Sequence, residues 1–404
     1  MKILCVHHYY GSESPSGENK VFDLEVQLLR SHGHHVIEYT RHSDEIRKQG
    51  VRGALKGGAS VPWNPFILRQ VRKLIEKEQP EVMHVHNTFP LISPAIFYAV
   101  NTTIPTATVL TLHNYRLFCA KALLMRYDQS CTSCLDSASV KPAIKYGCYR
   151  DSRLATLPLA LSIALHRRLN TWKNKIDAFI SLTEFQRGMM IRAGLAAETI
   201  YVKPHFYPDP PAPIEWDARE NKAIFIGRLG SEKGVRLLLE AWQMWGSDAL
   251  DLDIIGSGAE EDTLRKTVLA LGLHYKIKFL GQLSFQDTQN RLQQAKMLLL
   301  PSLSFEGFPM VIREAFALGV PVIASRLGAM TCLVNEKKNG FLFATGDVQA
   351  LLHVLKQAWM DEGNLEKMGR AARNSFESQY TAEANYNRLM DIYSAASSVK
   401  RQRM

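Results

Sequence analysis

Short apolar runs alternate with longer amphipathic segments along most of this chain. The runs are rich in Val, Ile, Leu and Phe, which is typical of buried parallel strands, and helical spacing of apolar residues follows them. Strands are predicted at 2–6, 35–39, 82–86, 107–113, 178–182, 223–226, 252–255, 278–281, 297–300 and 321–325. Alternating strands and helices predict parallel, doubly wound α/β sheets, which bind ligands at the carboxyl ends of their strands.

The strand at 223–226 leads into a glycine-rich loop, GRLGSEKG at 227–234, and then into a helical pattern at 235–242. A strand, a glycine-rich loop and a helix in this order can hold a diphosphate. Arg228 offers a planar fork for phosphate oxygens, and Lys233 offers a mobile point charge. The Gly-Ser-Gly at 256–258 predicts a second tight turn between a strand and a helix.

Residues 305–315 read FEGFPMVIREA and contain two glutamates, Glu306 and Glu314. Gly307 allows the backbone to approach a ligand, and Pro309 suits the first position of a helix. That helix would direct free N–H groups and its positive dipole end at an anion. The Glu314 carboxylate can accept hydrogen bonds from a pair of hydroxyls, so the segment indicates a nucleotide-sugar site. Taken alone, the segment is better explained as a surface helix that starts with Pro and has an acidic first turn.

The motifs GRLGSEKG, IIGSG, LPSLSFEGFPMVIREAFALGVPVIAS and NGFLF occur in this order between residues 223 and 345. Their order and spacing resemble the nucleotide-binding half of a GT-B glycosyltransferase of family GT4 (group 1). The resemblance implies two doubly wound Rossmann-like domains facing across a cleft. The implied segments are an acceptor-side domain at 1–206, a proline-rich linker at 207–221, a nucleotide-sugar domain at 222–378 and a helix at 379–404 that crosses back to the first domain.

The same resemblance assigns roles to individual residues. His113 would face the donor sugar, Glu306 would bind sugar hydroxyls and stabilise positive charge, and Glu314 would bind the ribose. Arg228 and Lys233 would replace a metal ion in stabilising the departing diphosphate. Domain closure would bring His113 over the donor and exclude water. The predicted donor-binding residues are Gly17, Gly227, Gly307, Phe308, Pro309, Met310, Val311 and Glu314.

Some positions depart from the family pattern or from a metal-dependent mechanism. The family usually has two glycines where this chain has Ser16 and Gly17, so a single glycine remains for close approach to the donor. Asp251 and Asp253 have the Asp-x-Asp spacing of a metal site, but they stand at the amino end of a predicted strand. We therefore expect them to be solvated strand positions.

The resemblance predicts a retaining hexosyltransferase that needs no cofactor for its chemistry. It would move a sugar from a nucleotide-diphosphate donor to a lipid-linked or polysaccharide acceptor in cell-surface polysaccharide biosynthesis. Two alternatives stay open, a GT-B nucleotide-sugar epimerase and a nucleotide-sugar-binding protein without catalysis. The joint presence of Arg228, Lys233, Glu306, Glu314 and His113 speaks against the second.

Charge and hydropathy bear on the location of the protein. A net charge of +10 is typical of proteins that bind nucleic acid, an anionic membrane or phosphorylated substrates. The sequence contains no nucleic-acid-binding motif, which makes the first of these the least favoured. The first residues read as a buried strand rather than a secretory signal, and no apolar run is long enough to span a bilayer. The apolar segment 154–165, with basic residues after it, predicts either an interfacial helix or a core helix. A cytoplasmic protein, peripheral at the inner leaflet, is expected.

Four of the six cysteines fall within thirty residues of one another, inside a predicted acceptor-side insertion at about 114–150. A cluster of thiols in an intracellular chain fits structural zinc better than disulfides. Four reduced thiols that only shape the loop after His113 are the alternative. Cys5 and Cys332 are expected to be small core residues. The predicted ligands of a structural zinc are Cys119, Cys131, Cys134 and Cys148.

Overall fold

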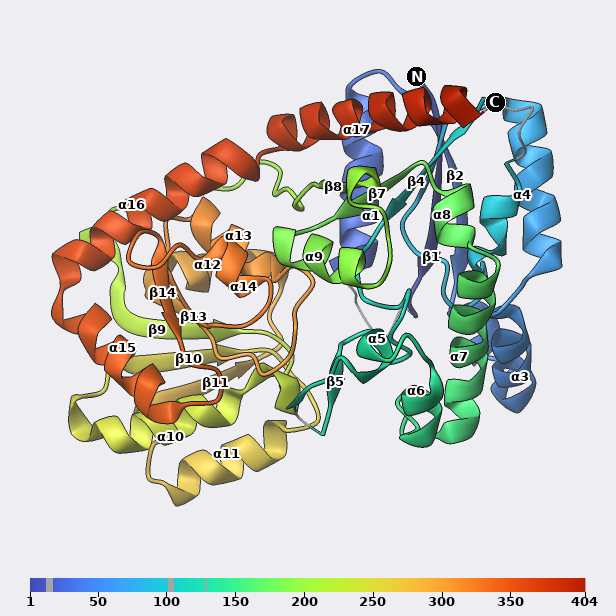
Figure 1. Ribbon diagram of the computed structural model, residues 1–404. Coiled ribbons are helices and arrows are strands. Elements are labelled where there is room, and N and C mark those ends of the chain that lie inside the picture. Colours follow the sequence, from blue (N-terminus) through green and yellow to red (C-terminus); the bar gives the residue numbers. More distant parts are fainter. Residues whose placement is uncertain (12–16, 101–104, 128, 404) are drawn as a thin grey trace. The chain divides into compact units, whose positions relative to one another are not determined.

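The computed structural model describes residues 1–11, 17–100, 105–127 and 129–403 (Figure 1). The chain divides into two compact units. The first contains Met1–Leu124, Thr132–His205 and Asn385–Met404, and the second contains Met125–Cys131 and Phe206–Ala384.

The first unit is built on a parallel sheet with the strand order β2-β1-β3-β4-β7-β8. Every described neighbour pair in this sheet runs parallel, as the alternation of strands and helices predicts. Its strands are β1 (Lys2–Tyr9), β2 (His35–His42), β3 (Val82–Val85), β4 (Ala107–Thr111), β7 (Ala178–Ser181) and β8 (Ile200–Val202). The strand order reverses between β1 and β3, so this unit has its topological switch point there.

Helices cover both faces of this sheet, and the last helix, α17 (Ala382–Arg403), belongs to this unit from Asn385 onward. Leu389, Ile392, Tyr393 and Ala396 of α17 pack into the same core as β1, β3 and α1. The other helices are α1 (Gly17–Ser31), α2 (Asp44–Arg47), α3 (Gly50–Ser60), α4 (Pro65–Glu78), η1 (Pro94–Tyr98), α5 (Ser133–Asp136), α6 (Lys141–Lys145), α7 (Arg153–Arg168), α8 (Thr171–Lys175), α9 (Glu184–Arg192) and η2 (Ala197–Thr199).

The second unit has the strand order β11-β10-β9-β12-β13-β14, also parallel throughout. This is the order of a dinucleotide-binding Rossmann sheet, and its switch point lies between β9 and β12. The strands are β9 (Glu220–Ile226), β10 (Asp251–Ile255), β11 (Ile277–Gly281), β12 (Ala295–Leu300), β13 (Val322–Ser325) and β14 (Gly340–Phe343), with a separate pair of short strands, β5 (Met125–Arg126) and β6 (Gln129–Ser130).

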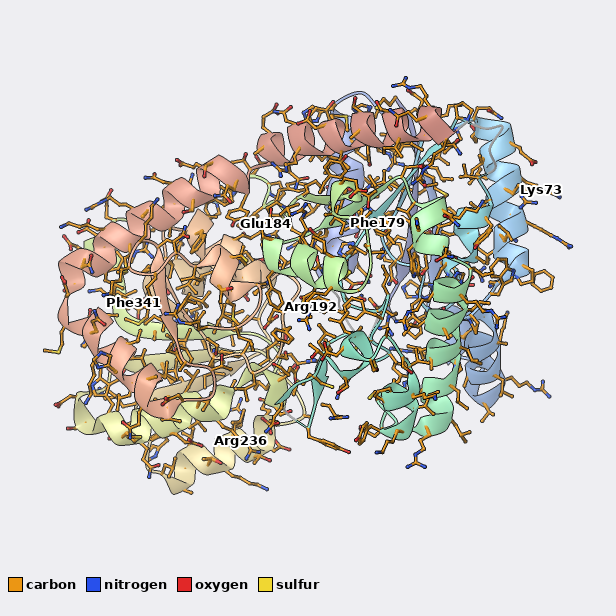
Figure 2. The ribbon with its side chains drawn as sticks, in the orientation of Figure 1. Lys73, Phe179, Glu184, Arg192, Arg236 and Phe341 are labelled. Carbon is orange, nitrogen blue, oxygen red and sulfur yellow. The ribbon has the colours of Figure 1, made fainter. Side chains whose placement is uncertain are left out.

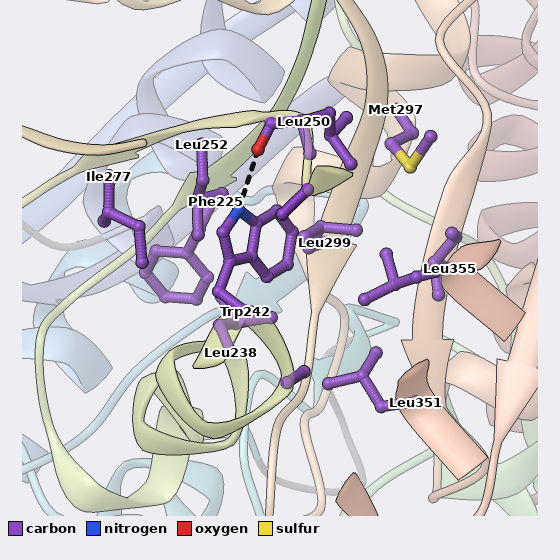
Figure 3. Packing of buried hydrophobic residues seen from close by; sticks show 14 of the residues in the cluster. Phe225, Leu238, Trp242, Leu250, Leu252, Ile277, Met297, Leu299, Leu351 and Leu355 are labelled. Carbon is purple, nitrogen blue, oxygen red and sulfur yellow. Dashed lines mark hydrogen bonds between the residues drawn. The ribbon is translucent and has the colours of Figure 1, made fainter. Parts of the chain in front are cut away.

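The core of the second unit is centred on Trp242, which is fully buried (Figure 3). Its indole N–H donates to the Leu250 carbonyl over 2.8 Å, so the one polar atom of the ring is satisfied. The helices of this unit are η3 (Trp216–Ala218), η4 (Ser231–Lys233), α10 (Val235–Trp245), η5 (Gly246–Asp248), α11 (Glu261–Ala270), α12 (Phe285–Gln294), α13 (Met310–Ala317), α14 (Met330–Leu333), α15 (Val348–Met360) and α16 (Glu362–Gln379).

The distribution of side chains agrees with the apolar pattern of the sequence. Phe179 and Phe341 are buried on strands, whereas Lys73 and Arg236 leave exposed helix surfaces (Figure 2). None of the described helices is long and apolar enough to cross a membrane. The doubly wound α/β prediction is confirmed for both units.

One polar position was predicted wrongly. Asp253 is only 2% exposed, and its carboxylate accepts from the Lys222 ammonium over 3.1 Å. It is therefore a buried, paired residue and not a solvated one, because β10 lies inside the sheet with β9 and β11 on either side. Asp251 stays partly exposed at the start of β10, as predicted.

Candidate functional site

The loops that follow β9, β10 and β12 meet through their backbones at the carboxyl edge of the second sheet. The Leu229 N–H donates to the Ser257 carbonyl (2.9 Å), and the Leu303 N–H donates to the Glu232 carbonyl (2.8 Å). Close approach requires glycine at two positions. A Cβ on Gly256 would lie 1.9 Å from the Gly227 carbonyl oxygen, and one on Gly234 would lie 2.1 Å from the Pro301 carbonyl oxygen. The motifs after β9 and β12 therefore pack against each other at one edge of the second sheet.

The side chains of Lys233 and Glu306 form an ion pair at this edge. The Lys233 ammonium donates to Glu306 Oε1 over 2.7 Å, and the Ser302 hydroxyl donates to the same oxygen over 2.7 Å. Burial raises the pKa of the Glu306 carboxyl, but Lys233 and Ser302 outweigh it and hold the pKa below its ordinary value. Glu306 is therefore ionised at neutral pH, next to a cation that lies at the switch point between β9 and β12.

Arg228 lies in the same loop but has a different partner. Its guanidinium donates to the Glu232 carboxylate, and the Arg228 side chain is 65% exposed. A phosphate group that bound Arg228 would replace Glu232 as the partner of the guanidinium, in a site open to water. Such an exposed pair contributes little to stability, so Arg228 can change partners at small cost.

Helix α13 begins beside these loops. Pro309 stands at its N-cap with a ψ of 100°, and the helix itself starts at Met310, one residue later than predicted. The N-cap residue supplies no side-chain cap, and the Ile312 N–H donates to the Pro309 carbonyl over 3.0 Å. The N–H groups of Met310 and Val311 are therefore the ones that can meet an anionic ligand. Gly227, Gly307, Phe308 and Val311 lie on the loops and the first turn that border this edge.

Glu314 lies in the middle of α13 and is 7% exposed. Gln289 of α12 donates to its Oε2 over 3.3 Å, and the guanidinium of Arg313 lies 3.7 Å from its Oε1. Arg313 is itself 1% exposed, and burial lowers its pKa while Glu314 raises it. Neither Arg313 nor Gln289 was predicted. Gln289 lies on another helix, α12, and the sequence does not show that the neighbouring Arg313 is buried.

In the first unit, His113 follows β4 near the switch point between β1 and β3. Its Nε2 lies 3.1 Å from Nδ1 of His86, which follows β3, and the two rings stack. Burial lowers the pKa of His113 well below its ordinary value, and the neighbouring His205 and His86 lower it further. His113 is therefore a neutral imidazole.

The amino end of α1 lies next to the loop that contains His113. Gly17 is the first residue of α1, and Glu18 Oε1 accepts from the Asn114 side-chain amide over 2.9 Å. The structure therefore brings Gly17 and His113 to the same edge of the first sheet, as the sequence predicted. Ser16, which replaces a family glycine, lies outside the described residues.

A pocket opens beside His113 and His86. Its volume is about 720 Å³, including space open to solvent. Most of its wall is apolar, with Phe89, Phe97 and Trp172 among the aromatic residues, and Asn87 and Arg116 supply polar groups. The Arg116 guanidinium lies 4.1 Å from the centre of the Phe89 ring and donates to the Ala120 carbonyl over 3.3 Å. The pocket can hold an apolar group with a negative charge at one end.

Comparison with known families covers both units. A model of Glycosyltransferase Family 4 matches residues 17–208, and a model of Glycosyl transferases group 1 matches residues 209–375. The chain belongs to this family of group 1 glycosyltransferases.

Curated relatives of this glycosyltransferase match it over part of their length. The chain is 28% identical over 178 residues to the amylovoran biosynthesis glycosyltransferase AmsK of Erwinia amylovora, covering 42% of the chain and 44% of the relative. It is 27% identical over 176 residues to the O-antigen chain mannosyltransferase C of Escherichia coli, covering 43% and 46%. These alignments span less than half of either relative.

Solved structures resemble the glycosyltransferase along nearly its whole length. A glycosyltransferase from Rickettsia africae has a TM-score of 0.70 at 16% identity, covering 98% of both chains. HepE from Anabaena, in complex with UDP, has a TM-score of 0.65 at 18% identity, covering 98% of this chain and 100% of HepE. At these identities the likeness shows the fold, which is GT-B.

The cysteines of the glycosyltransferase fall into two groups. Cys5 is buried on β1 as predicted, but Cys332 is exposed on α14, so its prediction as a core residue was wrong. The short helix α14 buries Met330 and Leu333, which leaves the intervening positions outside. Cys119, Cys131, Cys134 and Cys148 are all partly buried, and Cys134 and Cys148 pack against one small apolar cluster. A zinc site at these cysteines stays a prediction.

Proposed function

We propose that this protein transfers a sugar, with retention of anomeric configuration, from a nucleotide-diphosphate donor to a lipid-linked or polysaccharide acceptor. The observation that supports it best is the Lys233–Glu306 pair at the switch point of the second sheet. Departure of a nucleoside diphosphate develops negative charge on phosphate oxygens. Lys233, Arg228 and the first N–H groups of α13 are the groups that would stabilise this charge. Related proteins of polysaccharide assembly and a neighbour crystallised with UDP favour the same chemistry.

Glu306 would serve the sugar rather than the phosphate. An ionised carboxylate held by Lys233 and Ser302 can accept hydrogen bonds from sugar hydroxyls and favour positive charge at the anomeric carbon. Glu314 would accept both ribose hydroxyls, since Gln289 and Arg313 hold its carboxylate in place. In these roles the basic side chains would stabilise the departing phosphate, and Glu306 would stabilise positive charge on the sugar.

The pocket beside His113 favours an acceptor with an apolar part. Phe89, Phe97 and Trp172 would pack against a hydrocarbon stem, and Arg116 would bind its phosphate. The Nε of Arg116 is buried and has no hydrogen-bond partner among the described residues. A buried, unpaired N–H is costly unless a ligand satisfies it. A lipid carrier phosphate combines both features.

A donor screen tests the proposed reaction. UDP-, GDP- and ADP-sugars should be compared by thermal shift, and a donor present at 100 times its Kd should stabilise the protein by about 2.7 kcal/mol. The selected donor, labelled in its sugar, is then incubated with the protein and membrane lipid extract. Label in lipid or polysaccharide supports transfer. Altered sugar still joined to nucleotide indicates an epimerase, and binding without any turnover indicates a binding protein.

A surface of the first unit fits the proposed location at the cytoplasmic face of a membrane. Leu154, Leu157 and Leu161 lie on one side of α7 and are 80%, 37% and 59% exposed. Helix α3 packs against α7, where Gly58 faces Pro158 (Figure 1), and it exposes Val51 and Leu55 together with Arg52 and Lys56. Exposed apolar side chains with basic neighbours suit an anionic bilayer. The opposite side of α7 buries Leu159 and Ile163, as the core-helix alternative predicted, and the interfacial role of the exposed side is a proposal.

Vesicle binding should depend on this surface. Exchange of Leu154 and Leu161 for aspartate is expected to weaken binding to phosphatidylglycerol vesicles at least tenfold, because each exposed leucine contributes about 1 kcal/mol when it enters the bilayer. Sedimentation with vesicles measures the effect. Leu269→Asp is the matched control, since Leu269 is an equally exposed leucine (66%) on α11 of the other unit. Equal binding by all three proteins would exclude the proposed surface.

A further inference from the structure

A chain of three side chains crosses the interior of the first unit from α1 to the candidate site. Glu25 Oε1 lies 3.2 Å from Nε2 of His86, and Nδ1 of His86 lies 3.1 Å from Nε2 of His113. Glu25 is 2% exposed and His86 is 4% exposed. The three residues come from α1 and from the segments after β3 and β4, so they meet only in the folded unit.

Glu25 is the charged end of this chain. The ammonium of Lys203 donates to Glu25 Oε2 over 2.6 Å and to the Asn385 side chain over 3.1 Å. Burial raises the pKa of Glu25, but Lys203, His84 and His86 outweigh it and hold the pKa well below its ordinary value. The side chain is therefore a carboxylate, which only accepts hydrogen bonds.

The charge on Glu25 decides which nitrogen of His86 carries the proton. Glu25 Oε1 and His86 Nε2 are close enough to form an ion pair, but their geometry is not that of a regular hydrogen bond. A lone pair on His86 Nε2 would nevertheless face a carboxylate at 3.2 Å and be repelled, so that nitrogen must be N–H. A neutral His86 then has a lone pair on Nδ1, and His113 Nε2 must donate to it.

The hydrogen bond to His86 determines which nitrogen of His113 carries the proton. With its proton on Nε2, a neutral His113 has a lone pair on Nδ1. That atom is buried and has no hydrogen-bond partner among the described residues, and His113 lines the pocket described above. We propose that Glu25 and His86 are positioning residues, which hold His113 as a hydrogen-bond acceptor for a hydroxyl of the bound substrate. The identity of that hydroxyl rests on the proposed function, but the proton position does not.

A metal ion is the competing explanation for this cluster. Ligand atoms of Glu25, His84 and His86 lie within 4.8 Å of one another. His84, however, already uses both ring nitrogens, with Tyr393 Oη at 2.8 Å and Thr111 Oγ1 at 2.7 Å. The Lys203 ammonium, bound to the same carboxylate, would also repel a second cation. The hydrogen-bonded chain is therefore favoured over a metal site.

The proton position can be measured on the free protein by NMR of ¹⁵N-labelled histidine side chains, with the His113 signals assigned by their loss in His113→Asn. The expected spectrum shows a protonated Nε2 and an unprotonated Nδ1 for His113. In His86→Leu the acceptor is lost, and His113 should become a mixture of tautomers. In His86→Asn the side-chain oxygen takes the place of Nδ1 and should restore the single form. His84→Asn is the matched control, because His84 contacts Glu25 but is not bonded to His113.

Turnover of the donor selected in the screen gives the functional test. His86→Leu should lower kcat about tenfold or more, with a smaller change in donor KM, and His86→Asn should recover most of the loss. A His113 that is cationic or protonated on Nδ1 would refute the proposal. So would an unchanged kcat in a His86→Leu protein whose tautomers have shifted. If no nucleotide-sugar is turned over, the proposed function fails while the NMR result still decides the proton position.

Discussion

Replacement of Lys233 by alanine is expected to lower donor turnover about 10²–10³-fold, the effect of removing one charged donor from a site that stabilises a developing anion. Lys233 is the cation that the loop after β9 brings to the switch point of the second sheet, 2.7 Å from Glu306. Its loss removes charge from the site of the leaving phosphate. It also removes the main group that opposes the effect of burial on the pKa of Glu306, so that pKa should rise.

Steady-state kinetics with the selected donor measure the loss, and a melting curve shows whether the fold survives. Lys276→Ala is the matched control. Lys276 also forms an ion pair, 3.8 Å from Asp251, but it stands at the amino end of β11, at the opposite edge of the same sheet. Near-normal turnover by Lys233→Ala would refute the assignment of Lys233 to the leaving phosphate. An equal loss of turnover in Lys276→Ala would mean that both substitutions lower activity by disturbing the folded structure of the second unit.

The second-unit site could be predicted from the sequence because its parts are local. A strand, GRLGSEKG and a helix occur in consecutive residues, and so do the elements around Glu306 and Glu314. Each segment carries its own turn and helix-start signals. The bond between Lys233 and Glu306 was not predicted, because it joins residues 73 positions apart.

The interior of the first unit was predicted less well for the same reason. Glu25, Lys203 and Asn385 come from widely separated segments, and no local pattern indicates that they pair. One feature of the sequence does point to this network. His84 and His86 stand two positions apart at the end of a buried strand, so their side chains share a face. Polar residues on a buried face require partners, and this would have led to the network.

Asp253 shows how a rule about strand ends can fail. Its position near the start of a strand predicted contact with water, yet β10 has a neighbour on each side, and Lys222 of β9 reaches the carboxylate. Paired charges on adjacent strands depend on register, which sequence patterns alone do not determine.

The second large effect is expected at Glu314, where the ribose role predicts a change in affinity rather than in chemistry. Glu314→Gln should raise the donor KM and the Kd of the nucleoside diphosphate about 10–100-fold, since hydrogen bonds to a charged group contribute about 1.5–3 kcal/mol. The kcat should change much less, because the ribose lies away from the bond that breaks. Isothermal titration with the diphosphate and steady-state kinetics measure the two effects separately.

Alanine is the wrong substitution for this test. Arg313 is 1% exposed, and the Glu314 carboxylate lies 3.7 Å from its guanidinium. Glu314→Ala would leave that charge buried without its partner, at a cost of about 3–5 kcal/mol in the free energy of unfolding. Glutamine keeps the shape and one acceptor oxygen for Arg313, and Arg313→Met with Glu314→Gln removes both charges together. If the single and double variants bind the diphosphate as tightly as the native protein, Glu314 does not hold the ribose and its carboxylate serves only to neutralise Arg313.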